Sequence, residues 1–208
     1  MRALYLEVAT LSARLVGHPS VGQRWEQESA LRGFAVSGLA GHLARAILQV
    51  EWYLDAELPD AQLINASQYY AGLTGLDRPD SELNVGIRHR GEETASGGPD
   101  ALARQTEAAL ARLRVRLPAE PSDRRVGAAL GWVLLLDEYL KTRVVEMTVH
   151  IDDLASSVGL PPPELPAEAY DVAIDTLVGV ATLRHGHLAV LRALSRRERQ
   201  GPEILQVL

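Results

Sequence analysis

Residues 140–158, LKTRVVEMTVHIDDLASSV, decide the fold of this chain, because apolar residues recur there every three or four positions. This period places apolar side chains along one face of an α-helix. Gly159 follows directly, and glycine is common just past a helix C-terminus. The apolar positions are Leu140, Val144, Met147, Ile151, Leu154 and Val158. We therefore predict an amphipathic helix whose apolar face is buried in a helical core.

The same period recurs on both sides of this helix. It predicts further helices over residues 4–15, 37–58, 99–117 and 167–184, and a final helical turn over residues 188–194. We expect the apolar stripe of the last long helix to face the core: Tyr170, Ala173, Ile174, Leu177, Val180 and Ala181. Residues 60–98 and 122–136 carry no decisive period, and residues 126–136 fit either an extended segment or a helix start.

Amphipathic helices joined by loops predict an all-α fold. We expect an antiparallel four-helix bundle with a short C-terminal helical extension. The length of 208 residues fits one domain that spans residues 1–208. Hydrophobic residues make up 47% of the chain and aromatic residues only 5%, so Leu, Val and Ala must fill most of the core.

Composition excludes several classes of site and partner. The chain has no cysteine, which excludes disulfides, a cysteine nucleophile and a zinc–thiolate cluster. Its net charge of −6 lacks the basic footprint of a nucleic-acid-binding protein. No run of about 18 apolar residues predicts a membrane span. The N-terminus has no apolar signal core, so we expect a cytoplasmic location. A bundle of this size is compatible with a homodimer.

Glu146 and His150 lie four positions apart in the predicted helix and therefore on one face. At about 100° per residue, His150 is rotated by only about 40° from Glu146. The polar residues Lys141, Thr148 and Asp152 fall on the opposite side, so the pair flanks the apolar seam. A carboxylate removed from water is costly unless it is paired or bound to a metal ion. The spacing favours two metal ligands, and the open alternative is a buried Glu–His ion pair.

His42 is the candidate for a third ligand. It follows Leu39 by three positions and adjoins Leu43, so it lies on the apolar stripe of its own helix. One carboxylate and two imidazoles suit Zn²⁺, the ion that we expect, and also Fe²⁺, Ni²⁺ or Co²⁺. Three protein ligands leave a coordination position open for water or substrate, as in catalytic zinc sites. The alternative is a core histidine bonded to a backbone carbonyl.

Arg143 and Asp153 flank the two ligands on the same helix. Arg143 lies one turn before Glu146 and is a candidate to grip a carboxylate of a thiol or substrate. The alternative, which we favour, is a salt bridge to Glu146 or to a neighbouring helix. Asp153 lies three residues after His150 and is a candidate to orient its ring. Its alternative role is that of a solvated carboxylate.

Two motifs resemble a known family. Residues 143–154, RVVEMTVHIDDL, resemble the metal-binding motif of the mycothiol-dependent maleylpyruvate isomerase family. Residues 25–33 and 36–43 resemble the first motif of that family, and the histidine of that motif matches His42. Residues 184–186 and 189–194 also resemble relatives of this group. The resemblance implies a DinB-like four-helix bundle in which His42, Glu146 and His150 hold a metal ion.

The family's chemistry uses an external low-molecular-weight thiol, mycothiol, which agrees with a chain that has no cysteine. The resemblance thus implies a divalent-metal-dependent enzyme that uses such a thiol for S-transfer to an electrophilic substrate or for cis–trans isomerisation. The isomerase has a further C-terminal domain with substrate-binding groups, whereas this chain ends at Leu208, soon after the bundle and a basic tail of Arg196, Arg197 and Arg199. Two other classes stay open: a metal-dependent hydrolase and a non-catalytic metal-binding module.

Overall fold

The structure is a computed structural model that describes residues 1–76, 78, 80–195 and 202–207. Its helices are α1 (Arg2–Val16), α2 (Pro19–Gln23), α3 (Val36–Asp55), α4 (Ala66–Gly72), α5 (Glu82–Ala95), α6 (Pro99–Ala119), α7 (Leu136–Val158), α8 (Ala167–His185) and α9 (His187–Ser195). The described residues also form strands β1 (Leu63–Ile64), β2 (Arg125–Gly127) and β3 (Val133–Leu135) and short 3₁₀ turns η1 (Ala129–Gly131) and η3 (Pro202–Leu205). The arginines of the basic tail lie outside the described residues.

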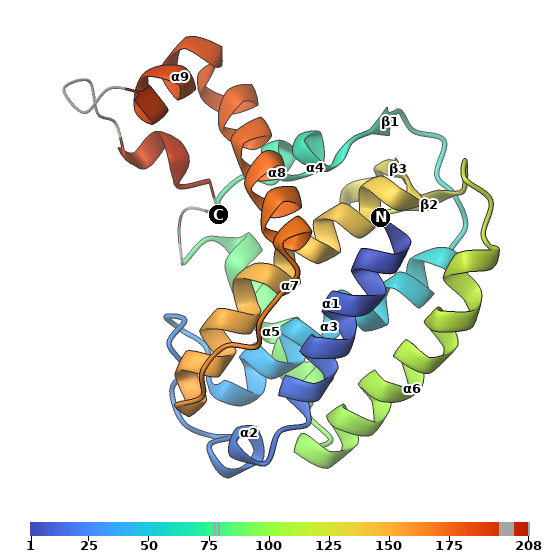
Figure 1. Cartoon of the computed structure of the whole chain (residues 1–208), viewed down its shortest axis with the longest axis vertical. Coiled ribbons are helices and arrows are strands. Elements are labelled where there is room, and N and C mark those ends of the chain that lie inside the picture. The colour runs from blue at the N-terminus through green and yellow to red at the C-terminus, as the bar shows by residue number, and fades with distance from the viewer. Residues whose placement is uncertain (77, 79, 196–201, 208) are drawn as a thin grey trace.

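Four long helices, α1, α3, α6 and α7, pack around a common core (Figure 1). Two contacts show that α3 and α7 are antiparallel. His42 contacts Glu146, and Gln49, further along α3, contacts Arg143, which precedes Glu146 on α7. Leu, Val and Ala supply most of the buried side chains, as the composition predicts. The all-α, DinB-like bundle expected from the sequence is therefore confirmed.

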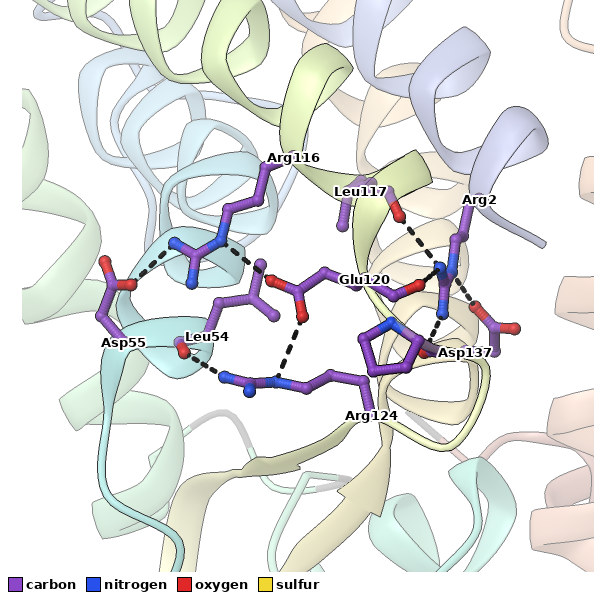
Figure 2. Close-up of polar contacts among 9 residues, drawn as sticks. Arg2, Leu54, Asp55, Arg116, Leu117, Glu120, Arg124 and Asp137 are labelled. Atoms are coloured by element: carbon purple, nitrogen blue, oxygen red, sulfur yellow. Dashed lines mark hydrogen bonds and ion pairs between the residues drawn. The ribbon is translucent and has the colours of Figure 1, made fainter.

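One end of this bundle is held by a charged cluster, which we call the arginine clamp (Figure 2). The clamp consists of Arg2, Asp55, Arg116, Glu120, Arg124 and Asp137. At its centre the Glu120 carboxylate accepts from Nε of Arg116 at 3.1 Å and lies 3.5 Å from Nε of Arg124. Arg116 also pairs with Asp55 at 2.7 Å. The clamp thereby joins the C-terminal ends of α3 and α6.

Arg2 adds the two remaining helices to the clamp. Its Nε donates to Asp137 at 3.1 Å, and its other nitrogens donate to the backbone carbonyls of Leu117, Glu120 and Pro121. The starts of α1 and α7 therefore meet at the end of α6. It follows that α1–α7 and α3–α6 are parallel pairs, whereas α1–α6 and α3–α7 are antiparallel. The long crossover that a parallel α3–α6 pair requires contains β1, α4 and α5.

α5 lies against α3 backbone to backbone, beside His42. A Cβ atom added at Gly41 would collide with the carbonyl oxygen of Gly91. A Cβ atom at Gly91 would in turn lie only 2.5 Å from the carbonyl oxygen of Gly38, next to the backbone nitrogen of His42. Only residues without a side chain permit this approach, so the two glycines fix α5 as a wall next to His42.

Residues 122–136, which the sequence left undecided, form a β-hairpin before α7 begins. β2 pairs antiparallel with β3, and β1 pairs parallel with the other edge of β3. The hairpin tip places Leu130 at φ 61° and Gly131 at φ 75°. Leucine rarely adopts this left-handed conformation, which explains why no turn signal was visible in the sequence.

α8 packs on α4 and α7, and α9 follows it at one edge of the molecule (Figure 1). The expectation that Tyr170 and Ile174 face the core is wrong, because they are 46% and 58% exposed. α8 docks instead through small side chains, and these are buried: Ala169, Ala173, Val180 and Ala181. Because these small side chains form a narrow contact face on α8, the larger side chains Tyr170 and Ile174 lie at the margin of that face. None of the described helices has the length and apolar character needed to cross a membrane.

Candidate metal centre

The three predicted ligands come together at the seam between α3 and α7. α3 carries His42 in its second turn, and α7 carries Glu146 and His150 one turn apart near its middle. Each helix buries an apolar face in the bundle, and the ligands lie at the edge of those faces. The three side chains are 16%, 18% and 16% exposed, so the cluster is largely buried but still reaches solvent.

The donor atoms converge on one point. Nε2 of His42 lies 3.2 Å from Oε2 of Glu146, and Nε2 of His150 lies 3.7 Å from the same oxygen. One ligand atom from each residue falls within 4.8 Å of the others. Ligands held about 2.0–2.2 Å from a tetrahedral Zn²⁺ are separated by about 3.4 Å. The two distances to Oε2 of Glu146 are close to this separation, so the cluster is compatible with a bound ion.

Asp153 orients His150, as one of the two sequence interpretations predicts. Its Oδ2 lies 2.9 Å from Nδ1 of His150. A hydrogen bond from Nδ1–H to the carboxylate leaves the lone pair on Nε2, the atom that faces Glu146. The ring of His150 also meets the ring of His42 edge to face, with centroids 4.7 Å apart.

Tyr70 makes the contact with the other oxygen of Glu146. Its hydroxyl lies 2.8 Å from Oε1 of Glu146 and 2.8 Å from the backbone oxygen of Thr142, and these acceptors share its single proton. Burial and the charge of Glu146 raise the pKa of Tyr70, so the hydroxyl stays protonated and donates. No sequence pattern pointed to Tyr70, which belongs to the undecided stretch 60–98.

Electrostatics keep Glu146 ionised and His42 neutral. Burial alone raises the pKa of Glu146, but the hydrogen bond from His42 and the positive charge of Arg143 outweigh burial and lower it below its ordinary value. Burial lowers the pKa of His42 more than its contact with Glu146 raises it. A carboxylate and a neutral imidazole are the protonation states that bind a metal ion.

Arg143 lies beneath the site rather than at its mouth. The residue is only 6% exposed, and its guanidinium donates to Gln49 on α3 at 3.1 Å and to the hydroxyl of Thr142 at 3.1 Å. It also stacks over the ring of Tyr139, 5.0 Å from the centroid. This arrangement favours a packing and electrostatic role that links α7 to α3 over contact with a bound thiol or substrate.

A depression of about 820 Å³ opens elsewhere, between residues 72–74, residues 80–83 and Leu130. None of the three candidate ligands lines it. The assignment of the site therefore rests on convergent donor atoms and their hydrogen-bond partners, not on the size of a cavity.

Comparisons with known proteins identify the family and the fold. Residues 5–155 match the family model described as mycothiol maleylpyruvate isomerase N-terminal domain. Among solved structures, a mycothiol-dependent maleylpyruvate isomerase aligns with a TM-score of 0.53 at 20% identity, over 88% of this chain and 70% of that chain. A histidine-to-alanine mutant of such an isomerase aligns with a TM-score of 0.51 at the same identity and coverage. At this identity the structural likeness is one of fold.

No curated protein matches the sequence. The family match covers α1 to α7, and with them all three candidate ligands. This chain belongs to the family of the mycothiol maleylpyruvate isomerase N-terminal domain.

Proposed function

We propose that His42, Glu146 and His150 bind one divalent metal ion and that the resulting centre activates an external thiol. The observation that carries the proposal is the convergence of three donor atoms within 4.8 Å at a largely buried, partly exposed seam. The donor set suits Zn²⁺ best among the ions considered, and also Fe²⁺, Ni²⁺ or Co²⁺.

A bound divalent cation lowers the pKa of a thiol, so that the nucleophilic thiolate forms at neutral pH. The residues of the chain prepare this chemistry. Glu146 supplies the negative charge, His42 stays neutral, and Asp153 fixes the ring of His150. The chain has no cysteine, so the sulfur must come from a separate molecule. Family membership makes mycothiol, a low-molecular-weight thiol, our candidate for it.

The reaction that we propose is attack of this thiolate on an electrophilic small molecule. Addition to an activated double bond, rotation and loss of the thiol give cis–trans isomerisation, and displacement of a leaving group gives S-transfer. The isomerase activity belongs by name to the solved relatives and is a proposal for this chain. A cytoplasmic location, a homodimer, a single domain over residues 1–208 and the absence of nucleic-acid partners stay predictions from the sequence.

The test is elemental analysis of the purified protein, followed by titration of the Co²⁺-substituted protein with mycothiol. Roughly one equivalent of metal, and a new sulfur-to-cobalt absorption band on adding thiol, support the proposal. Glu146→Ala and His150→Ala should lose both. Metal uptake without a thiol response, together with ester or amide turnover, would favour a hydrolase. Metal uptake with neither response would favour a non-catalytic module.

A further inference from the structure

Tyr70 is the residue through which α4 reaches the candidate metal ligands. We propose that Tyr70 is a positioning residue that holds Oε1 of Glu146 and thereby presents Glu146 to the metal ion through Oε2 alone. This inference rests on the metal-binding function proposed above. Its direct support is that the hydroxyl of Tyr70 lies 2.8 Å from Oε1, while Oε2 is the oxygen nearest to both histidines.

The hydrogen bond matters because a glutamate can bind a cation through one oxygen or through both. With Oε1 engaged by Tyr70, Glu146 would offer a bound ion Oε2 alone. Other coordination positions would then stay available to a thiol and a substrate. Hydrogen bonds to metal-binding carboxylates commonly set their orientation and affinity in this way.

α4 is anchored at its start, so the place of the Tyr70 hydroxyl is well defined. Asn65 and Gln68 form a capping box at the N-terminus of α4. The backbone N–H of Ala66 donates to Oε2 of Glu138 on α7 at 3.0 Å. Tyr70 itself is 1% exposed, and its hydroxyl also contacts the backbone oxygen of Thr142 on α7. α4 is thus fixed to the helix that carries Glu146.

Arg184 of α8 anchors the other end of α4. One of its terminal nitrogens donates to the backbone oxygens of Tyr70 at 3.0 Å and Leu73 at 3.1 Å. Its second terminal nitrogen donates to the backbone oxygen of Val207 at 2.9 Å. One guanidinium therefore ties α8 and the C-terminal segment to the backbone of Tyr70. We expect loss of Arg184 to loosen Tyr70 and to affect Glu146 through it.

The primary test compares Tyr70→Phe with a matched control, Tyr5→Phe. Tyr5 is also fully buried, but among the described residues its hydroxyl has a hydrogen bond only to the backbone oxygen of Ala46, at 3.3 Å. Zn²⁺ affinity is measured by competition with a chromophoric chelator, and the coordination of Co²⁺ by its visible absorption. Tyr70→Phe should bind Zn²⁺ about 10–100-fold more weakly, as for other lost outer contacts of metal ligands. Its Co²⁺ spectrum should weaken toward higher coordination, and Tyr5→Phe should match wild type.

The outcomes separate this inference from the proposed function. If wild type binds no metal, both proposals fail. If wild type binds metal and Tyr70→Phe gives the same affinity and the same Co²⁺ spectrum, only the role of Tyr70 fails. Should Tyr70→Phe unfold, Arg184→Met serves as the second variant, with the exposed Arg192→Met as its control. Arg184→Met should lower the Zn²⁺ affinity and change the Co²⁺ spectrum in the direction expected for Tyr70→Phe. If Arg184→Met leaves both the Zn²⁺ affinity and the Co²⁺ spectrum unchanged, the inference is overturned.

Discussion

The arginine clamp and the metal-ligand cluster are two carboxylate-centred sites in one bundle, and they differ in what surrounds the carboxylate. Glu120 is 13% exposed and contacts two guanidinium groups, which are permanently charged. Glu146 is 18% exposed and faces two imidazoles, one of which is kept neutral by burial. Both carboxylates are withdrawn from water to a similar degree.

The partners therefore decide what each site does. In the clamp, positive side chains of the same protein neutralise Glu120, so the network is complete without an added ion. In the ligand cluster, the nearest permanent positive charge is Arg143, which lies on the buried side, and the Nε2 atoms of both histidines lie near Oε2 of Glu146. This convergence of donors, with no permanent cation among them, supports the metal site that we propose.

The largest expected effect is loss of the response to metal in Glu146→Ala. For wild type, Zn²⁺ at a hundredfold excess over its dissociation constant should raise the free energy of unfolding by about 2.7 kcal/mol. Glu146→Ala should show no gain, because one of three ligands is missing. Calorimetric melts with Zn²⁺ and with chelator measure the difference, and Glu120→Ala is the control that keeps the gain. An equal gain in Glu146→Ala would place the ion elsewhere.

The next effect concerns the wall beside His42. Gly41→Ala puts a methyl group against the backbone of Gly91, so α5 must move away from α3. We expect a loss of about 2–3 kcal/mol in unfolding free energy, typical of overpacking, with weaker Zn²⁺ binding because His42 is adjacent. Urea titrations measure the first and chelator competition the second. In the control Gly22→Ala, the new methyl group meets Pro99 at an ordinary 3.4 Å. This variant should change neither the unfolding free energy nor the Zn²⁺ affinity.

Glu120→Ala tests the clamp itself. Removal of the carboxylate leaves Arg116 and Arg124 short of a partner, and we expect the unfolding free energy to fall by about 1–2 kcal/mol. Zn²⁺ affinity should not change, since the clamp lies about 20 Å along α3 from His42. A parallel loss of Zn²⁺ affinity would show that the clamp and the ligand cluster are coupled, and it would contradict their independence.

The smallest effect is expected at the outer contact of His150. Asp153→Asn weakens the acceptor that fixes the ring, so Zn²⁺ binding should fall about tenfold, or about 1.4 kcal/mol. Stability without metal should stay near that of wild type. The exposed neighbour Asp152 supplies the matched control Asp152→Asn, for which no change is expected. Equal effects in the two variants would refute a specific role for Asp153.

Helix period and residue chemistry were enough to predict the bundle and to nominate His42, Glu146 and His150. Both depend on local spacing: the apolar seam of α7 places Glu146 and His150 together, and the stripe of α3 places His42 at its edge. The resemblance to the family added the link between the two helices. The contact of Asp153 could be predicted for the same reason, because Asp153 lies one helical turn from its partner His150.

Features that depend on distant contacts were not predictable. Tyr70 lies on a seven-residue helix, too short to show a period, and contacts Glu146 across 76 positions of sequence. The hairpin before α7 has an apolar run that suits a strand or a helix, and a Leu130 that breaks the usual turn composition. Tyr170 and Ile174 fit the apolar helical stripe of α8. They nevertheless lie outside its contact face, which is narrow because small residues form it.

The glycine contact between α3 and α5 has a consequence for engineering the surface of α5. Because backbone meets backbone at Gly41 and Gly91, the spacing of the two helices does not depend on the size of any side chain there. Outward-facing positions of α5, such as His89 and Glu93, can then be varied in charge or bulk while His42 keeps its place. A library of variants built on these positions would alter the surface of α5 and leave the ligand geometry as it is.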